Sequence, residues 1–118
     1  EDALTLKAAG VDGIQVSSHG ARQLESAPVP IEMLAKIREQ IGADYPLFFD
    51  SGIRSGEDVL RALTQGADFV FLGRILQYAL AAGHEPGLHK LWDVISEEMS
   101  IAMAQTGLTS PKDINRSR

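Results

Sequence analysis

The sequence predicts an α/β fold, and within that class the C-terminal portion of a TIM (β/α)8 barrel: about three βα units, corresponding to strands 6–8. Three observations support this prediction. Short apolar runs alternate with helical patterns, a glycine–aspartate pattern before the first run recurs before the third, and polar and glycine residues follow every run. Strands that alternate with helices of this length are typical of βα units in a parallel sheet.

The three predicted strands are short and rich in β-branched and aromatic residues. They cover residues 13–18, 46–50 and 68–73. The second and third are almost continuously apolar, which is typical of strands that are buried on both faces. We therefore expect a parallel sheet that is covered on both sides.

Helical patterns precede the first strand and separate the strands from one another. Residues 2–9 are expected to form a helix that leads into the first strand. Apolar residues at spacings of three and four mark a second helix over 31–41, directly after Pro30. A third helix is expected to begin at Ser55-Gly-Glu-Asp58, a pattern typical of a capping box.

The last part of the chain predicts a longer helix. It is expected to begin near Pro86 and to end at Gly107, with Glu97 and Glu98 on its solvent side. A capped turn over 110–113 and a polar tail follow. The predicted order of elements is therefore α-β-α-β-α-β-α.

An internal repeat gives the size of each βα unit. Residues 6–17 resemble residues 62–73, with Gly10 matching Gly66 and Asp12 matching Asp68. The matching glycines lie 56 positions apart with one strand between them, so each unit has about 28 residues. A (β/α)8 barrel of about 250 residues has roughly 31 residues per unit. A small open sheet is the alternative, but it would leave two unpaired apolar edges.

The composition excludes several classes of protein. The 118 residues carry a formal net charge of −5, have a mean hydropathy of −0.05 and include no cysteine. Disulfide scaffolds, zinc–thiolate sites, iron–sulfur proteins and cysteine nucleophiles are therefore excluded. The acidic balance argues against a nucleic-acid-binding surface, and no apolar run approaches the ~18–20 residues that span a bilayer. We expect no metal site, since His84 and His89 do not share a helix face.

The first strand is followed by a histidine and an arginine. His19 and Arg22 lie three positions apart, next to Gly20. Imidazole titrates near neutral pH and can take a proton, and guanidinium can form a forked pair with a carboxylate. Reactive groups of parallel barrels sit at the carboxyl ends of the strands. The sequence therefore predicts an acid–base group beside an anion clamp.

The ends of the second and third strands predict a phosphate site. Glycines follow both strands, and Arg54 and Arg74 supply positive charge. Backbone N–H groups beside glycines can approach an anion closely, and the helix that Ser55 opens is expected to attract one at its N-terminus. A phosphate site in the loops after strands seven and eight recurs among barrels.

These segments resemble one known family. Residues 17–24, Ser-Ser-His-Gly-Ala-Arg-Gln-Leu, are similar to the Ser-Asn-His-Gly-Gly-Arg-Gln-Leu signature of FMN-dependent α-hydroxy acid dehydrogenases and oxidases. That group includes glycolate oxidase, lactate oxidase, mandelate dehydrogenase and flavocytochrome b2. The resemblance continues through residues 50–56, 66–74 and 103–107 and on to residues 114–116, so it covers essentially the whole chain.

The resemblance implies a role for each matching residue. His19 would be the base that takes a proton from the hydroxy acid, and Arg22 would bind the substrate carboxylate. The residues that the resemblance assigns to FMN are Ser17 near the ring system, and Asp50, Ser51, Gly52, Ile53, Arg54, Gly73 and Arg74 at the ribityl chain and phosphate.

The chain departs from the family pattern at five positions. Ser18 stands where Asn is usual, Ala21 and Ser51 stand in place of glycines, Ser55 in place of a second arginine, and Ile75 in place of a proline. Without the second arginine, one fewer cation lies near the phosphate.

The implied activity is the FMN-dependent oxidation of a small L-2-hydroxy acid to the 2-oxo acid. Two alternatives stay open: a phosphate-binding barrel lyase or isomerase, and a folded fragment without activity. The resemblance leaves the electron acceptor unknown and implies a homo-oligomer, in many family members a tetramer. We expect no nucleic-acid partner. We expect a cytoplasmic location, with peripheral membrane association of the full-length enzyme as the alternative.

The family also carries active-site residues that precede this region: two tyrosines, an aspartate that orients the histidine, and a lysine near flavin N1. None of them can be assigned in this sequence. We therefore expect residues 1–118 to be the C-terminal part of a single FMN-binding barrel domain whose N-terminal part is absent, and we expect the isolated chain not to turn over substrate.

Overall fold

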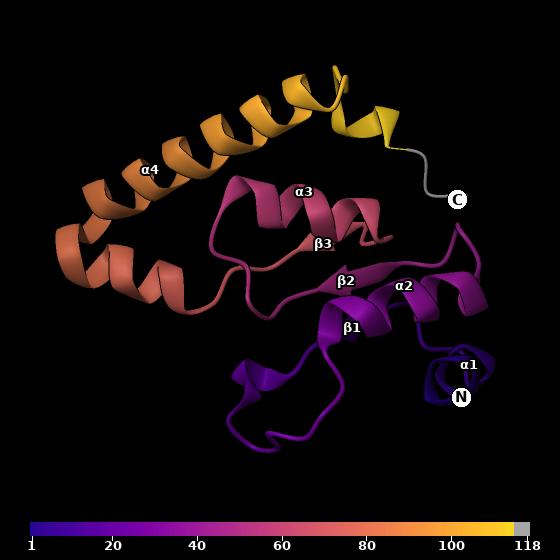
Figure 1. The fold of residues 1–118 in the computed structure, drawn as a ribbon. Coiled ribbons are helices and arrows are strands. Elements are labelled where there is room, and N and C mark those ends of the chain that lie inside the picture. The colour runs from indigo at the N-terminus through magenta and orange to yellow at the C-terminus, as the bar shows by residue number, and fades with distance from the viewer. Residues whose placement is uncertain (115–118) are drawn as a thin grey trace.

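A computed structural model of the chain describes residues 1–114 (Figure 1). The polar tail, and with it the Asn115–Arg116 end of the segment that resembles the family, lie outside the described residues. The elements in chain order are α1 (Asp2–Ala8), β1 (Ile14–Val16), η1 (His19–Ala21), α2 (Pro30–Ile41), β2 (Leu47–Phe49), α3 (Gly56–Thr64), β3 (Phe69–Val70), α4 (Arg74–Gln105) and η2 (Pro111–Asp113).

The strands form one parallel sheet in the order β1-β2-β3. Ile14 pairs with Leu47 in one ladder, and Phe48 pairs with Phe69 in the other. The prediction of a mixed α/β fold with a parallel sheet is confirmed, and each strand is shorter than its apolar run. Because the strands are parallel and adjacent, the loops that follow them emerge at the same edge of the sheet.

The core lies between the sheet and the helices on one face of it. Ile14, Val16, Leu47 and Phe49 are buried there, together with residues of α2 and α3, chiefly Leu34, Ile41 and Ala62. Alternate residues of a strand point to opposite faces, so Phe48, Phe69 and Phe71 lie on the other face. Phe69 is 56% exposed and Phe71 43%, and their rings meet edge to face. The expectation of a sheet covered on both sides is wrong for the described residues.

A buried arginine joins the amino ends of the strands. Arg38 of α2 is only 6% exposed. Its Nε donates to the Gly66 carbonyl at 2.8 Å and its Nη2 to Asp68 Oδ2 at 2.7 Å. Nη1 donates to the carbonyls of Gly42, Ala43 and Tyr45. Asp68 also accepts from the Leu47 N–H. A paired and fully hydrogen-bonded charge is the form in which an ion is tolerated in a core.

The internal repeat has a structural counterpart. Gly10 and Gly66 follow α1 and α3, with φ angles of +84° and +107°. Both take the left-handed conformation that turns a helix end toward the next strand. Gly66 also lies against Arg38, because a Cβ at this position would lie 2.6 Å from the Arg38 Cγ.

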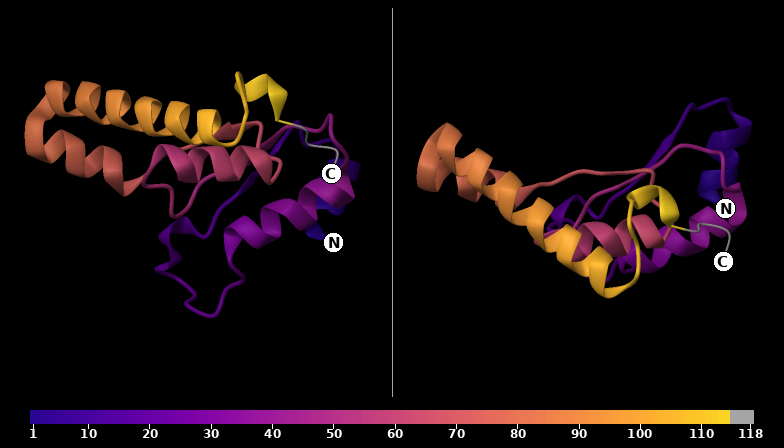
Figure 2. Two further views of the ribbon diagram at one scale, coloured as in Figure 1. Left: turned by 45° about the horizontal axis from the view of Figure 1, so that its top comes forward. Right: turned by 90° about the horizontal axis from the view of Figure 1, so that it is seen from above.

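Helix α4 begins earlier than predicted. It starts at Arg74 rather than near Pro86, and it is a pair of helical arms joined at a corner where Gly83 and His84 leave helical geometry. Figures 1 and 2 show the two arms folding back on one another at this corner. Gly87 permits the sharp turn, since a Cβ there would lie 2.1 Å from the Ala79 carbonyl oxygen.

The C-terminal turn agrees with the prediction. Ser110 and Asp113 cap η2 reciprocally, so the predicted capped turn is confirmed. Searching the helices of the described part of the chain reveals none with the length and apolar character needed to cross a membrane.

Candidate functional site

A cavity of about 290 Å³ lies at the carboxyl edge of the sheet. Nine of the ten residues that the sequence assigns to the site line it: His19, Arg22, Asp50, Ser51, Gly52, Ile53, Arg54, Gly73 and Arg74. Ser17 does not line this cavity and lies instead beside the outer edge of β1. Three loops that are far apart in sequence therefore surround one space.

The first loop carries the histidine in an uncommon backbone conformation. His19 and Ala21 have φ angles of +51° and +56°. The Ser17 hydroxyl oxygen accepts the His19 N–H at 2.9 Å, so this serine supports the histidine through its backbone. The side chains of His19 and Arg22 are exposed and face the cavity. Both are therefore open to a small molecule bound there.

The second loop is joined to β1 and to the first loop by one side-chain hydrogen bond each. The Gln15 amide donates to Asp50 Oδ1 at 3.3 Å, and the Ser18 N–H donates to Ser51 Oγ at 2.9 Å. Ser51 has a φ of +91°, in the region that favours glycine. The loops after β1 and β2 therefore hold one another through side chains.

The start of α3 is already occupied by the protein's own groups. The Asp58 N–H donates to Ser55 Oγ, and the Arg54 N–H donates to Asp58 Oδ2. The Gly56 N–H donates to Glu98 Oε2 at 2.8 Å. The predicted cap at Ser55 is confirmed, but the expectation that this helix start attracts a phosphate is wrong, because two carboxylates already satisfy and surround it.

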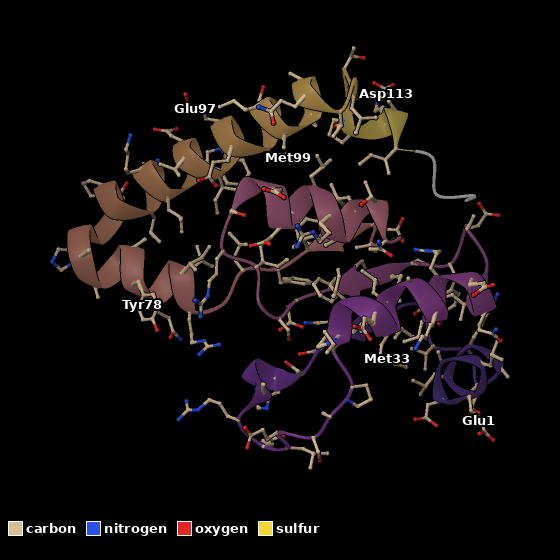
Figure 3. All side chains as sticks on the ribbon, in the orientation of Figure 1. Glu1, Met33, Tyr78, Glu97, Met99 and Asp113 are labelled. Atoms are coloured by element: carbon tan, nitrogen blue, oxygen red, sulfur yellow. The ribbon has the colours of Figure 1, made fainter. Side chains whose placement is uncertain are left out.

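The contact with α4 explains why the α3 start is closed. Gly56 is buried, and a Cβ there would lie 2.2 Å from the Met99 backbone nitrogen and 2.3 Å from the Ile95 carbonyl oxygen. Figure 3 shows Met99 on the side of α4 that faces α3 and Glu97 on the opposite side. Glu97 and Glu98 are exposed, as predicted, and the Glu98 carboxylate also reaches back to the start of α3.

The start of α4 is open. Gly73 is its N-cap and provides no side-chain cap. Among residues 1–114, no protein group accepts the backbone N–H of Gly73, Arg74, Gly52 or Ile53. These four donors line the same cavity as the exposed side chains of Arg54 and Arg74. Free N–H groups, a helix N-terminus and two guanidinium groups are the donor set that a phosphate requires.

Metal ligation has no comparable donor set. Searching residues 1–114 reveals no group of three or more His, Asp or Glu side chains arranged to hold an ion. The donors at the cavity are hydrogen-bond donors and cations, which select an anion.

The chain matches one family model, that of FMN-dependent dehydrogenases, over residues 1–118. It belongs to the FMN-dependent dehydrogenase family. Among its relatives, L-lactate oxidase from Alicycliphilus denitrificans is 45% identical, over 97% of this chain and 31% of that protein. L-lactate dehydrogenase from Xanthobacter autotrophicus is 46% identical, over 98% of this chain and 30% of that protein. The chain thus spans about a third of the length of these members.

Solved structures of the family have the same fold over this region. A mandelate oxidase variant, solved with a monooxide FMN adduct, superposes with a TM-score of 0.90 at 41% identity, covering 98% of this chain and 37% of that one. The topology of the described residues is therefore that of a part of an FMN-dependent oxidase.

Sequence reasoning missed two features of the site. The first is the Ser18–Ser51 hydrogen bond, for which the unusual serine after β2 was the available signal. The second is Glu98 at the start of α3, for which the sequence carries no signal, because its position depends on the corner in α4.

Proposed function

We propose that this chain supplies the histidine, the arginine and the phosphate loops of an FMN-dependent oxidoreductase that converts a small L-2-hydroxy acid to the 2-oxo acid. The observation that carries the proposal is the single cavity lined by nine of the ten expected residues. The family membership of the chain and the names of its relatives agree with it.

The substrate end of the cavity is formed by the loop after β1. The Arg22 guanidinium can form two parallel hydrogen bonds with a carboxylate, which orients the substrate. His19 lies three positions away on the same loop and can take the proton of the substrate. The positive charge that His19 gains stays next to a bound anion, which favours the protonated imidazole.

The phosphate end is formed by the loops after β2 and β3. We assign the FMN phosphate to the N–H groups of Gly52, Ile53, Gly73 and Arg74, with Arg54 and Arg74 balancing its charge. Asp50 lines the same cavity and would hold the ribityl chain. When bound, FMN supplies the redox chemistry by accepting the two electrons that leave the substrate.

The three βα units are proposed to belong to a closed (β/α)8 barrel, as its strands 6–8. The exposed rings of Phe69 and Phe71 support this, because they lie on the face opposite the helices, where a barrel has its interior. The parallel order β1-β2-β3 leaves β1 and β3 as edges that neighbouring strands would pair with.

Substitution of His19 tests the proposed chemistry in the full-length protein. His19→Gln should lower kcat by at least about 1,000-fold, since the base is lost, while the flavin absorption of the purified protein stays unchanged. His89→Gln is the matched control because His89 is exposed on α4, where it pairs only with Glu85 in the described structure. Loss of flavin together with activity in His19→Gln would assign a structural role to this histidine instead.

The absorption spectrum separates this proposal from the lyase or isomerase alternative. A purified full-length protein with flavin absorption, bleached by lactate, glycolate or mandelate, agrees with the proposal. A colourless protein that binds phosphate esters would favour the alternative. Assays of residues 1–118 with and without FMN test whether this part is inactive alone.

Two further properties are proposed from the resemblance alone. We propose a homotetramer, which light scattering of the full-length protein tests. We also propose a cytoplasmic location, with peripheral membrane association as the alternative. Cell fractionation distinguishes the two.

A further inference from the structure

We propose that Ser51 is a positioning residue for His19, and that its hydroxyl group joins the phosphate loop to the loop that carries the base. The proposal rests on the proposed function, because it assigns His19 the role of base. It concerns the side-chain hydroxyl, whereas the site described above uses the backbone of the loop after β2.

The contact lies directly beside the histidine. The Ser18 N–H donates to Ser51 Oγ at 2.9 Å, and the next N–H along the chain, that of His19, donates to Ser17 Oγ at 2.9 Å. Two consecutive N–H groups of the loop are therefore each held by a serine hydroxyl. Ser17 holds the loop from its own strand, whereas Ser51 holds it from the neighbouring strand.

The loop requires such support. His19, Gly20 and Ala21 all have positive φ angles, and non-glycine residues keep this conformation only where surrounding contacts stabilise it. No other side chain of a neighbouring strand donates to or accepts from the backbone of residues 18–21 within the described part of the chain. Without the Ser51 hydroxyl, the His19 backbone would be held only by its own loop.

The backbone conformation of Ser51 indicates that its hydroxyl group has a role in the site. Its φ of +91° is a conformation that glycine adopts without strain and serine does not. A glycine at position 51 would be relaxed but would leave the Ser18 N–H unpaired. The family pattern that the chain resembles has glycine at this position. The serine therefore has a strained backbone conformation, and its hydroxyl group makes one hydrogen bond to the loop that carries His19.

This link connects the two ends of the cavity. Ser51 is followed by Gly52, which lines the same cavity, and Ser18 is followed by His19. An anion that orders the loop after β2 would therefore also order the loop that carries the base. We expect Ser51 to affect the rate of proton removal more than the binding of FMN.

Two substitutions in the full-length, FMN-loaded protein test this role. Ser51→Ala removes the acceptor and keeps the strained Cβ, whereas Ser51→Gly removes the acceptor and relaxes the backbone. Both should lower kcat by about 5- to 10-fold, the value of one hydrogen bond, with the FMN dissociation constant changed less than about 2-fold. The deuterium isotope effect on kcat with the 2-deuterated hydroxy acid should rise, because cleavage of the C2–H bond becomes slower.

Ser55→Ala is the matched control. Ser55 is also a serine of the loop after β2, but its hydroxyl caps α3 and contacts neither the base loop nor the cavity. This variant should lower the melting temperature and leave kcat and the isotope effect unchanged. A loss of kcat in Ser55→Ala equal to that in the Ser51 variants would show a general effect of loop stability and overturn the proposal.

The outcomes also separate this proposal from the proposed function. If the wild-type protein binds FMN and turns over, and Ser51→Gly retains full kcat, the positioning role is wrong and the proposed function stands. If the Ser51 variants lose FMN affinity with kcat unchanged, the hydroxyl serves the cofactor directly and the positioning role is again wrong. If the wild-type protein has no flavin and no turnover, both proposals fail together.

Discussion

Helices α3 and α4 both have a glycine at their start, Gly56 as the first residue of α3 and Gly73 as the N-cap of α4, yet the two helix starts differ in burial, in hydrogen bonding and in the charges beside them. Gly56 is buried beneath α4, and the N–H groups around it are satisfied by Ser55, Asp58 and Glu98. Gly73 is exposed, and within residues 1–114 its N–H has no acceptor. One helix start holds the fold together, and the other is left available for an anion.

The difference has a physical consequence for stability and for binding. A satisfied helix start contributes to the free energy of folding, whereas an uncapped one forgoes up to about 1–2 kcal/mol of capping stabilisation. The chain forgoes that stabilisation at α4, beside Arg54 and Arg74, and keeps it at α3, beside two carboxylates. Charge and donor availability therefore both favour an anion at α4.

Substitution of Gly56 and of Gly73 gives the largest predicted difference, which is a difference in the free energy of unfolding. Gly56→Ala should destabilise the protein by about 3 kcal/mol, because the new Cβ would overlap the backbone of Met99 and Ile95, which cannot move without shifting α4. Gly73→Ala should change stability by less than about 0.5 kcal/mol, since a Cβ at Gly73 has no neighbour within 4 Å. Urea unfolding of both full-length variants measures the difference, and equal losses would contradict it.

Removal of the cationic side chain at the α4 start gives the next largest effect. Arg74→Ala should weaken FMN binding by about 30-fold, or about 2 kcal/mol, the value of a charged hydrogen bond. Lys36→Ala on α2 should leave FMN affinity unchanged, because the exposed Lys36 side chain does not line this cavity. Titration of the apoprotein with FMN compares the two variants. A similar loss in Lys36→Ala would mean that overall charge, rather than the α4 start, governs affinity.

The turn η2 is a third helix start, and it is capped by the protein's own side chains. It gives the smallest predicted effect, which concerns the pH dependence of stability. The Thr109 hydroxyl, with the N–H groups of Ser110 and Thr109, lowers the pKa of the Asp113 carboxyl group below its ordinary value. Its contribution to stability is therefore present above the ordinary aspartate pKa and is lost as the pH falls through the lowered value. A carboxyl NMR titration should show a pKa of Asp113 below the ordinary aspartate value. An ordinary titration, or one unchanged by Thr109→Val, would contradict this account.

Much of the fold follows from local sequence patterns. The β-branched runs, the Ser55 cap and the Gly10–Gly66 repeat depend on residues close in sequence, and each appears in the structure where it was predicted. The early start of α4 was missed because Gly83, Pro86 and Gly87 interrupt the helical pattern at the corner. Its contacts bring residues about 40 positions apart together.

The site was predictable to the extent that parallel strands bring their following loops to one edge. That rule was enough to gather His19, Arg22 and the two phosphate loops around one cavity. The choice between the starts of α3 and α4 could not be made from sequence, since each start has a glycine and an arginine within two positions of it. Glu98 decides it, and only the packing of α4 on α3 places Glu98 there.

Comparing FMN with riboflavin tests the central claim most directly, since riboflavin has the same ring and ribityl chain without the phosphate. The account predicts that the full-length apoprotein binds FMN at least about 100-fold more tightly than riboflavin, and that Arg74→Ala reduces this ratio while Lys36→Ala does not. Equal affinity for the two flavins would contradict the assignment of a phosphate to the open start of α4.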